Sequence, residues 1–360
     1  MQQFFKRHLK VAALVLMGFT VAFLQPASAA ERTHFKLAWS IYAGWMPWGY
    51  AVDHGIIKKW AKKYGITIDV TQVNDYIQSI NQYTSGDYDA CLMTNMDALT
   101  IPAAAGVDST AFIVGDFSNG NDGIVLKGKG RKFADIKGRR VNIVELSVSQ
   151  YLLDRALQMH DMSERDLKLV NTSDADMVAA YKAPSTTAVV TWKPQLSTIL
   201  ASPDATEVFN SSRIPGEIID MAVIKTGVMH KYPRFAKALA GAWYETMKIM
   251  TGKDAAAKAA LTSMARATGT DLEGYKSQLA TTRMFYSSAE AVKFTASPKL
   301  LKTMDYVRQF SFEHGLLGEG AQSVDAVGIA FPGGKVLGDR HNVKLRFDDR
   351  FMKMAADGKL

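Results

Sequence analysis

Apolar positions along the chain follow two different periods. Short runs such as 35–39 and 66–70 alternate with polar residues, which is typical of strands, whereas the apolar residues within 47–64 recur at helical spacing. Strand, loop and helix patterns then succeed one another up to residue 126 and again from 141 to 191. This order predicts an α/β fold in which mostly parallel sheets are flanked by helices.

The loops that follow the predicted strands should converge in space. In a mostly parallel sheet, every strand-to-helix loop lies at the same edge, where small ligands bind. The first of these loops carries three large aromatic residues and no charge. Aromatic rings without Lys or Arg suit a planar or cationic ligand better than an anion, although the same rings could simply pack under the following helix. The rings are Tyr42, Trp45 and Trp48, and the loops are 42–48, 74–76, 94–97 and 116–122.

The length of the chain predicts two lobes, because residues 31–360 exceed the usual size of one hydrophobic core. A basic, glycine-rich turn at 127–132 lacks the spacing of a phosphate-binding loop and is interpreted as a crossing between the lobes. The expected divisions are 31–127 for the first part of lobe I, 128–219 for lobe II, 220–330 for the return to lobe I with C-terminal helices, and 331–360 for a C-terminal tail.

The first 30 residues have the pattern of a secretory signal peptide. Lys6, Arg7 and Lys10 form a basic start, an apolar run follows at 11–24, and small residues at 26–30 offer a cleavage site. The apolar run is too short for a membrane-spanning helix. The pattern therefore predicts export. The single cysteine, Cys91, leaves no partner for an internal disulfide.

Charge and histidine placement argue against two other classes of function. Three of the 43 Lys and Arg residues lie in the signal peptide, which leaves 40 basic against 35 acidic residues, mixed along the chain. Mixed charge of this kind does not predict nucleic-acid binding. The seven histidines are scattered, and neither a His-x-x-x-His nor a Gly-x-Ser-x-Gly motif occurs. We therefore expect binding rather than catalysis, with no metal or cofactor, and a secreted enzyme is the competing class.

Carboxylates dominate the converging loops. Five acidic residues lie there, and Lys193 is the only cation close to them in the sequence pattern. An anion site would need free Arg, Lys or helix N-termini, whereas buried carboxylates beside aromatic rings suit a cation. Burying a small cation without an anion would cost several kcal/mol, so at least one carboxylate should contact the ligand. The acidic residues are Asp75, Asp97, Asp116, Asp122 and Glu145.

Asp97 and Glu145 are the best candidates for a pair that binds one ligand from two lobes, because each directly follows a predicted strand in a different lobe. The alternative for Asp97 is placement in the first turn of a helix, where acids are favoured anyway. Asp122 could instead only shape its Asn-Gly-Asn-Asp turn. The predicted ligand-binding residues are Tyr42, Trp45, Trp48, Asn95, Asp97, Asp116, Glu145, Ser147, Ser149 and Trp192.

Four segments in order resemble the solute-binding proteins of ABC importers in the nitrate/sulfonate/taurine-type group. They are 49–58, 83–90, 133–141 and 187–194. The chain departs from the group at Thr187-Ala188, where an aspartate is usual. The resemblance covers roughly 35–251. It implies a type II periplasmic-binding-protein fold with the ligand between two lobes, a monomer in the periplasm, and a permease in the inner membrane as partner.

Within that group, the chain is most similar to the subgroup associated with urea carboxylase. The similarity lies in 45–48, 93–97, 116–122, 145–149 and 190–194. It implies guanidinium or, second to it, urea as the ligand. Two rival ligands on the same fold are a thiamine-precursor pyrimidine, which would also use aromatic rings, and a sulfonate or nitrate anion, against which the acidic loops argue.

Overall fold

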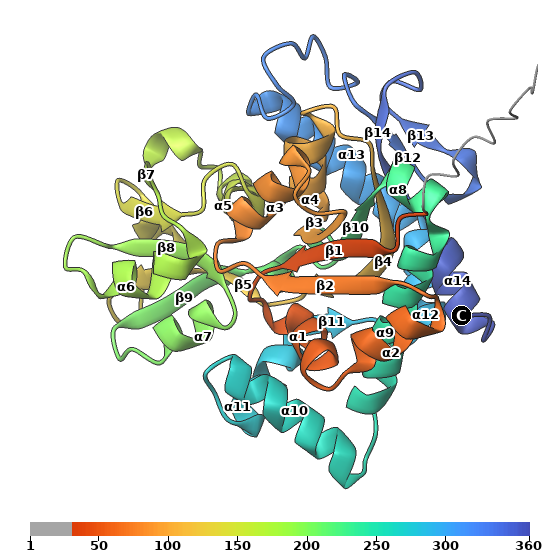
Figure 1. Cartoon of the computed structure of the whole chain (residues 1–360). Helices are drawn as coiled ribbons and strands as arrows, with labels where there is room; N and C mark the ends of the chain where they lie inside the picture. Colours follow the sequence, from red (N-terminus) through yellow and green to blue (C-terminus); the bar gives the residue numbers. More distant parts are fainter. Residues whose placement is uncertain (1–30) are drawn as a thin grey trace, which may run out of the picture. The chain divides into compact units, whose positions relative to one another are not determined.

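Two mixed β-sheets carry the fold in the computed structural model, which describes residues 31–360 (Figure 1). The segment predicted to be a signal peptide, 1–30, lies outside the described residues. Thr33–Leu360 forms one unit, and it contains both sheets. The predicted α/β fold with two sheets and flanking helices is confirmed. The sheets are mixed rather than mostly parallel, because β10 and β5 run antiparallel to both of their neighbours.

The larger sheet has nine strands within the described residues. Its order is β13 (Val336–Leu337), β12 (Gly328–Ala330), β14 (Val343–Phe347), β4 (Ser109–Ser118), β10 (Ile219–Lys225), β3 (Ala90–Thr94), β1 (His34–Trp39) and β2 (Thr67–Gln72), and β11 (Thr282–Met284) pairs with β4. The smaller sheet has the order β7 (Lys168–Asn171), β6 (Arg140–Ile143), β8 (Ala188–Trp192), β5 (Asp122–Lys127) and β9 (Ala205–Asn210).

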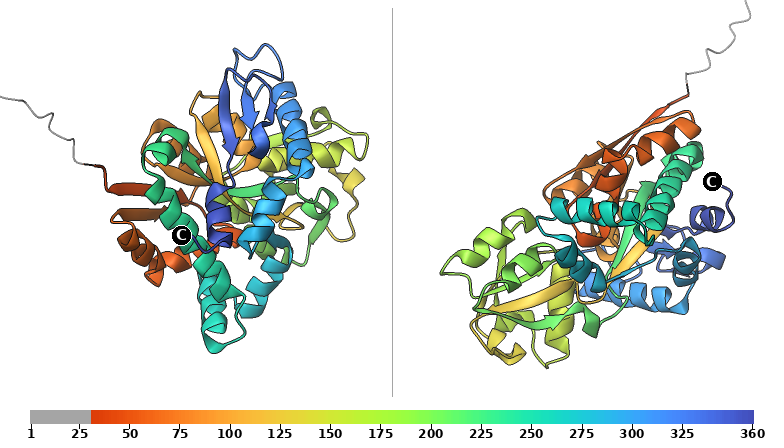
Figure 2. Two further views of the ribbon diagram at one scale, coloured as in Figure 1. Left: turned by 90° about the vertical axis from the view of Figure 1, so that its right-hand side faces the viewer. Right: turned by 90° about the horizontal axis from the view of Figure 1, so that it is seen from below.

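Helices cover the faces of both sheets (Figures 1 and 2). Phe35 on β1 stacks on Phe235 of α9 with ring centroids 4.7 Å apart, which fixes the longest helix against the larger sheet. The helices are α1 (Met46–Asp53), α2 (Ile56–Lys63), α3 (Tyr76–Ser85), α4 (Asn95–Ala98), α5 (Val148–Gln158), α6 (Met177–Lys182), α7 (Gln195–Leu200), α8 (Thr226–Lys231), α9 (Pro233–Met250), α10 (Ala255–Ala267), α11 (Leu272–Ala280), α12 (Ser288–Thr295), α13 (Pro298–Glu313) and α14 (Arg350–Ala356).

The helix predicted over 47–64 is two helices. Gly55 stands between α1 and α2 with φ +70°, a left-handed conformation that glycine adopts without strain. The chain bends there, and both helices still bury an apolar side, with Trp48 and Ala51 on α1 and Ile57 on α2. The hydrophobic spacing alone does not reveal such a break, because the apolar positions on either side keep the same period.

The chain passes from the larger to the smaller sheet at 119–121 and returns at 211–218. The sequence pattern suggested the first crossing at 127–132 and read 116–122 as a loop. Instead, β4 continues to Ser118, because Asp116 pairs with Asp220 and Ser118 pairs with Thr282. Strand β5 consequently belongs to the smaller sheet. The lobe boundaries given above stay a prediction, and the two crossings are the connections that a hinge would use.

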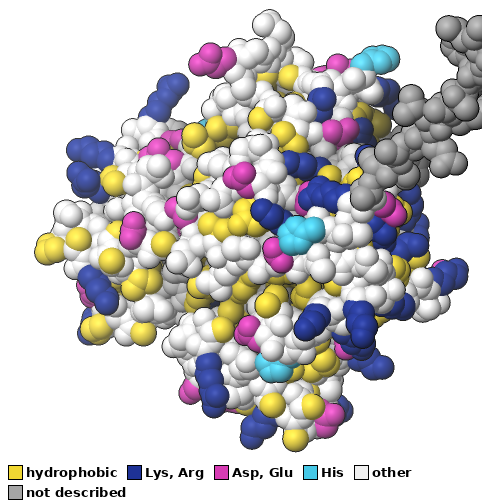
Figure 3. Space-filling view, viewed as in Figure 1, with side chains coloured by type: hydrophobic (Ala, Val, Ile, Leu, Met, Phe, Trp, Pro, Cys, Tyr) yellow, Lys and Arg dark blue, Asp and Glu magenta, His cyan; other side chains and the backbone are white. Residues whose placement is uncertain are grey.

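Lys and Arg side chains are spread over several elements on the face shown in Figure 3, and they are mixed there with Asp and Glu. Among residues 31–360, no helix is both long and apolar enough to cross a bilayer.

Candidate functional site

A small cavity lies where the two sheets meet. The strands β10 and β3 of the larger sheet reach it, and so do β5 and β8 of the smaller sheet. About 20 Å³ of it is open to the centre of a water-sized sphere, which is room for a group of very few heavy atoms. Its lining consists of Tyr42, Trp45, Tyr76, Thr94, Asp122, Val148, Trp192, Ile218 and Asp220.

Strand pairing places the polar residues of the site in two rows. In the larger sheet Asp220 on β10 pairs with Thr94 on β3 and with Asp116 on β4, so the three residues form one row across adjacent strands. In the smaller sheet Asp122 on β5 pairs directly with Trp192 on β8. The register of each sheet therefore brings paired residues to the cavity: Thr94 and Asp220 from the larger sheet, and Asp122 and Trp192 from the smaller one.

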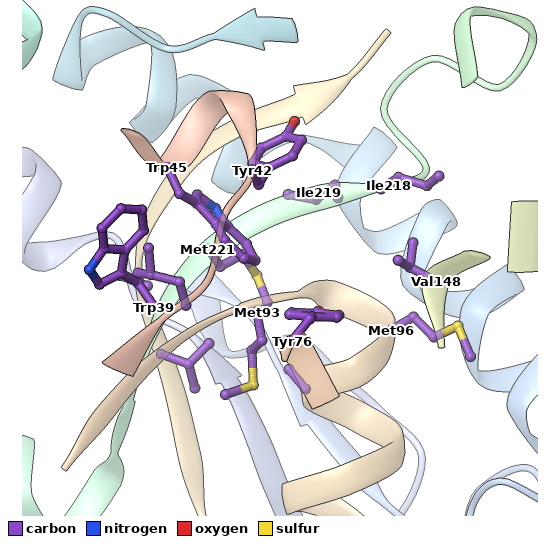
Figure 4. Packing of buried hydrophobic residues seen from close by; sticks show 14 of the residues in the cluster. Trp39, Tyr42, Trp45, Tyr76, Met93, Met96, Val148, Ile218, Ile219 and Met221 are labelled. Atoms are coloured by element: carbon purple, nitrogen blue, oxygen red, sulfur yellow. The ribbon is translucent and has the colours of Figure 1, made fainter. Parts of the chain in front are cut away.

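Four aromatic rings form a continuous wall. Tyr42 meets Trp45 edge-on at 5.2 Å between ring centroids, Trp45 lies 5.7 Å from Tyr76, and Tyr76 meets Trp192 edge-on at 5.5 Å. All four rings are buried. Figure 4 shows Tyr42 and Trp45 coming from the segment after β1, while Tyr76 and Val148 come from other elements around the same space. Such a wall presents π-faces to a ligand that enters the cavity.

Asp97 lies immediately behind the wall. Its Oδ2 accepts a hydrogen bond of 2.5 Å from the Tyr76 hydroxyl and one of 2.8 Å from Thr94 Oγ1. The backbone of Val148, at the start of α5, lies near this carboxylate and lowers its pKa. Burial nevertheless raises the pKa of Asp97 to about 6. Within the described part of the chain, its Oδ1 has no hydrogen-bond partner.

Asp116 and Asp220 form a pair of touching carboxyl groups. Their side chains are hydrogen-bonded to each other, and the Tyr42 hydroxyl donates to Asp116 Oδ1 at 2.8 Å. Burial raises the pKa of both carboxyls. Asp116 raises the pKa of Asp220 further, whereas the hydrogen bond with Asp220 lowers that of Asp116. Gly44 is required beside them, because a Cβ there would lie 2.6 Å from Asp116 Oδ2.

Asp122 completes an acidic lining. Its backbone N–H is bonded to Ser118 Oγ at 3.1 Å, and burial raises the pKa of its carboxyl to about 7, with the charge of Asp97 adding to the rise. The described lining residues include no Lys, Arg or His. Lys193 donates instead to Thr281 Oγ1 at 2.9 Å, and burial lowers its pKa. Among residues 31–360, no group of three or more His, Cys, Asp or Glu side chains has the arrangement of a metal site.

Hydrogen bonds join the parts on either side of the cavity. Asp174 Oδ1, in the turn before α6, accepts from the backbone N–H of Tyr76 at 3.0 Å. Ser173 Oγ donates to Asp75 Oδ2 at 2.9 Å, and Trp192 Nε1 donates to the carbonyl of Ile41 at 3.2 Å. Each of these bonds links the larger sheet's side to the smaller sheet's side, so the cavity is described in a closed arrangement.

Five of the residues proposed from the sequence lie at this site. Tyr42, Trp45 and Trp192 line the cavity, and Asp97 and Asp116 lie directly behind its lining.

The other five lie elsewhere or act on the backbone. Trp48 stacks on Trp243 with ring centroids 5.2 Å apart. The Asn95 side chain donates a hydrogen bond to the carbonyl of Glu217 and accepts one from the backbone N–H of Ile219. Ser147 caps α5 by accepting from the N–H of Ser149, and the buried Ser149 hydroxyl has no partner within residues 31–360.

The structure does not bring Glu145 to Asp97. Glu145 is half-buried and lines a different cavity, together with Leu146 and Asn171, whose side chain accepts from the Glu145 backbone N–H. It follows a strand as expected, but the chain turns at Leu146, with φ +60°, before α5 begins. The N-terminus of α5 therefore reaches Asp97, and the Glu145 side chain does not.

Sequence reasoning missed Tyr76 and Asp220 and gave Asp122 only a turn-shaping role. Asp220 had a signal, since it is the only charged residue in the apolar run 218–224. Tyr76 also had a signal, since it ends 74–76, one of the loops predicted to converge, but it was not chosen as a ligand-binding residue. What brings them together is the register between strands that lie far apart in the sequence.

Two sheets joined by two crossings, with a cavity at their junction, match the type II periplasmic-binding-protein fold. The alkanesulfonate-binding protein SsuA from Xanthomonas axonopodis pv. citri, solved with MOPS bound, matches with a TM-score of 0.68 and 17% identity, over 83% of this chain and 99% of that one. The nitrate-binding protein NrtA from Synechocystis PCC 6803 matches with a TM-score of 0.55 and 13% identity, over 92% of this chain and 99% of that one.

The chain belongs to the NMT1-like family, whose model matches residues 38–265. A curated relative is the taurine-binding periplasmic protein of Escherichia coli strain K12, 21% identical over 183 residues. That match covers 50% of this chain and 56% of the relative, so the chain spans little more than half the length of the curated protein it matches.

Proposed function

We propose that the protein is the periplasmic substrate-binding component of an ABC importer and that its ligand is a small planar cation, guanidinium first and urea second. One observation carries the choice of ligand. Buried carboxyl groups surround an aromatic-lined cavity whose described lining has no basic side chain. A cation bound there would be paired and desolvated together with its counter-charges, which is the condition for burying a charge without a large penalty.

Guanidinium fits this chemistry in three respects. It is planar and always charged at neutral pH, and its N–H groups donate in forks that match carboxylates. One carboxyl oxygen each of Asp97, Asp116 and Asp220 has no donor within residues 31–360. The faces of Trp45 and Trp192 can stack on the ligand plane.

The size of the cavity supports a ligand of a few heavy atoms over the rival ligands. About 20 Å³ is open to the centres of water-sized spheres, which is room for about one or two waters and favours a ligand of few heavy atoms. The similar proteins named above are called taurine-, nitrate- and alkanesulfonate-binding. An anion in the present cavity would face Asp122 and Asp220 without a compensating cation. We therefore propose that this chain uses the shared fold for a ligand of opposite charge.

Transport follows from closure rather than from chemistry on the ligand. Bonds such as that between Asp174 and Tyr76 form only when the two sides meet, so a ligand that adds contacts to both sides shifts the population toward the closed form. A membrane permease that recognises the closed form would then receive the ligand. The signal-peptide pattern at 1–30 supports export to the periplasm, and we propose that the exported protein is a monomer and not an enzyme.

Isothermal titration calorimetry tests the proposal. The exported chain is unfolded and refolded to remove carried-over ligand, and it is then titrated with guanidinium chloride at micromolar concentrations, with urea, taurine and nitrate as parallel ligands. We expect saturable guanidinium binding, weaker urea binding and none for either anion. Binding of taurine or nitrate without guanidinium binding would overturn the proposed ligand and leave the fold assignment intact.

A further inference from the structure

The carboxyl groups of Asp116 and Asp220 lie side by side, and one oxygen of each has no donor among residues 31–360. They face each other across paired strands, their side chains are hydrogen-bonded, and both residues are buried, with Asp220 only 3% exposed. Tyr42 satisfies Asp116 Oδ1, whereas Oδ2 of Asp116 and Oδ2 of Asp220 have no donor within the described chain. Two touching carboxylates cannot both remain ionised in such a place, so the pair holds a proton between them when the site is empty.

Among the described residues that line the cavity beside the pair, none is Lys, Arg or His. The titratable groups that act on it are Tyr42 after β1, Asp122 on β5, Tyr275 on α11 and Tyr286 after β11. Each is neutral or negative at neutral pH. Asp220 lines the cavity and Asp116 lies behind it, so a ligand in the cavity contacts the side of the pair that Tyr42 leaves open.

We infer that Asp116 and Asp220 exchange their shared proton for the bound cation and thereby select a permanently charged ligand over a neutral one of the same shape. The inference rests on the proposed function. On binding, the O–H bond of the pair breaks, the proton leaves to solvent, and N–H groups of the cation donate to the freed oxygens. Charge in the buried site is thus conserved, since one positive charge replaces another.

The exchange explains how one site could separate guanidinium from urea, which have nearly the same shape. Guanidinium replaces the proton and keeps the pair neutralised. Urea carries no charge, so the pair must keep its proton, and one carboxyl oxygen remains a donor rather than an acceptor. If one proton is released per cation bound, the affinity for guanidinium falls tenfold for each unit by which the pH drops below the pKa of the pair.

The experiment counts protons during guanidinium binding. Calorimetric titrations of the exported chain at pH 7 in buffers with different ionisation enthalpies give the number of protons released per cation. Wild type should release about one or more, and urea should release close to none. In Asp220→Asn the amide can donate to Asp116, so that carboxylate needs no shared proton, and the number released should fall by about one.

Two variants keep the result interpretable. Glu145→Gln changes a carboxyl that lines a different cavity and leaves the pair intact, so it should retain the proton released by the pair. Asp116→Asn removes the other partner and should reproduce the loss seen in Asp220→Asn if that variant does not fold. Guanidinium binding without proton release, or equal release in wild type and in Asp220→Asn, would overturn the exchange. Absence of guanidinium binding would instead overturn the proposed function.

Discussion

Two tryptophans only three positions apart have different surroundings. Trp45 lines the cavity between Tyr42 and Tyr76, whereas Trp48 faces the core and stacks on Trp243 of α9. The two side chains are of the same type and equally buried, with 4% and 2% of their surfaces exposed. The buried fraction of a side chain therefore does not distinguish a ligand contact from a packing contact at this site. The residues that surround each ring do distinguish them.

The same replacement at these two positions should have opposite effects. Trp45→Leu removes a π-face from the cavity and should weaken guanidinium binding about 3- to 30-fold, with little change in melting temperature. Trp48→Leu should leave the affinity nearly unchanged and lower the unfolding free energy by roughly 2–4 kcal/mol, because it empties part of the core. Calorimetry and thermal unfolding of both variants provide the test. A loss of affinity in Trp48→Leu alone would contradict the assignment of the two rings.

Two acidic residues allow a similar comparison. Asp97→Asn keeps an oxygen for Tyr76 and Thr94 but removes the charge, and it should weaken guanidinium binding by about tenfold or more. Glu145→Gln, on a carboxylate that lines a different cavity, should leave the affinity unchanged. Titration of both variants with guanidinium and urea shows which of the two carboxylates contributes to binding. An unchanged affinity in Asp97→Asn together with a loss in Glu145→Gln would restore the pairing expected from the sequence.

At the scale of elements, helix starts carry much of the site. Tyr76 is the first residue of α3. Its hydroxyl donates a hydrogen bond to Asp97, and its backbone N–H donates one to Asp174 across the cavity. Val148 begins α5, and its backbone lowers the pKa of Asp97 from the opposite side. The positive end of each helix dipole thus faces a carboxylate of the other side, which favours the closed arrangement.

Removing Asp174 should therefore act on closure more than on folding. In Asp174→Ala the N–H of Tyr76 loses its partner, and we expect guanidinium affinity to fall about 3- to 10-fold while the melting temperature of the unliganded protein changes little. Asp176→Ala, on an exposed side chain in the same turn, is the matched control and should behave as wild type. Equal affinities in wild type and Asp174→Ala would show that this bond does not contribute to the liganded state.

The elements themselves were largely predictable, and their pairing was not. Period-two runs located β1 and β2 within a few residues, because alternation is a local property. The break at Gly55 and the extension of β4 to Ser118 depend on a backbone conformation and on partner strands, neither of which shows in local periodicity. For the same reason the sequence located the aromatic and acidic character of the site and missed Asp220, whose role arises from its neighbours on β3 and β4.

At the scale of the whole molecule, buried carboxyls connect the site to the stability of the fold. Burial raises the pKa of Asp97 to about 6 and that of Asp122 to about 7, so the folded protein binds these protons more tightly than the unfolded chain does. Their contribution to stability is fully present below the unfolded pKa of about 4 and is lost as the pH rises through 6 to 7.

The unliganded protein should accordingly lose stability between pH 5 and pH 8, by about 1.4 kcal/mol from Asp97 alone. Asp122→Asn should flatten this dependence, because the amide has no proton to lose. Millimolar guanidinium should also flatten it, since a bound cation compensates the ionised carboxylates. Thermal unfolding at several pH values measures each effect. A stability that rises steadily from pH 5 to pH 8 in the unliganded protein would contradict the neutral state assigned to these carboxyls.

The central claim is that a cation binds between the two sheets, in contact with carboxylates and aromatic rings. The most direct measurement is a crystal structure of the refolded chain with guanidinium, together with one grown in taurine. We predict a planar ligand in the cavity, with its nitrogens within hydrogen-bond distance of Asp220 and Asp122 and its face against Trp45 or Trp192. A sulfonate group in that cavity, or guanidinium only at sites outside it, would contradict the account.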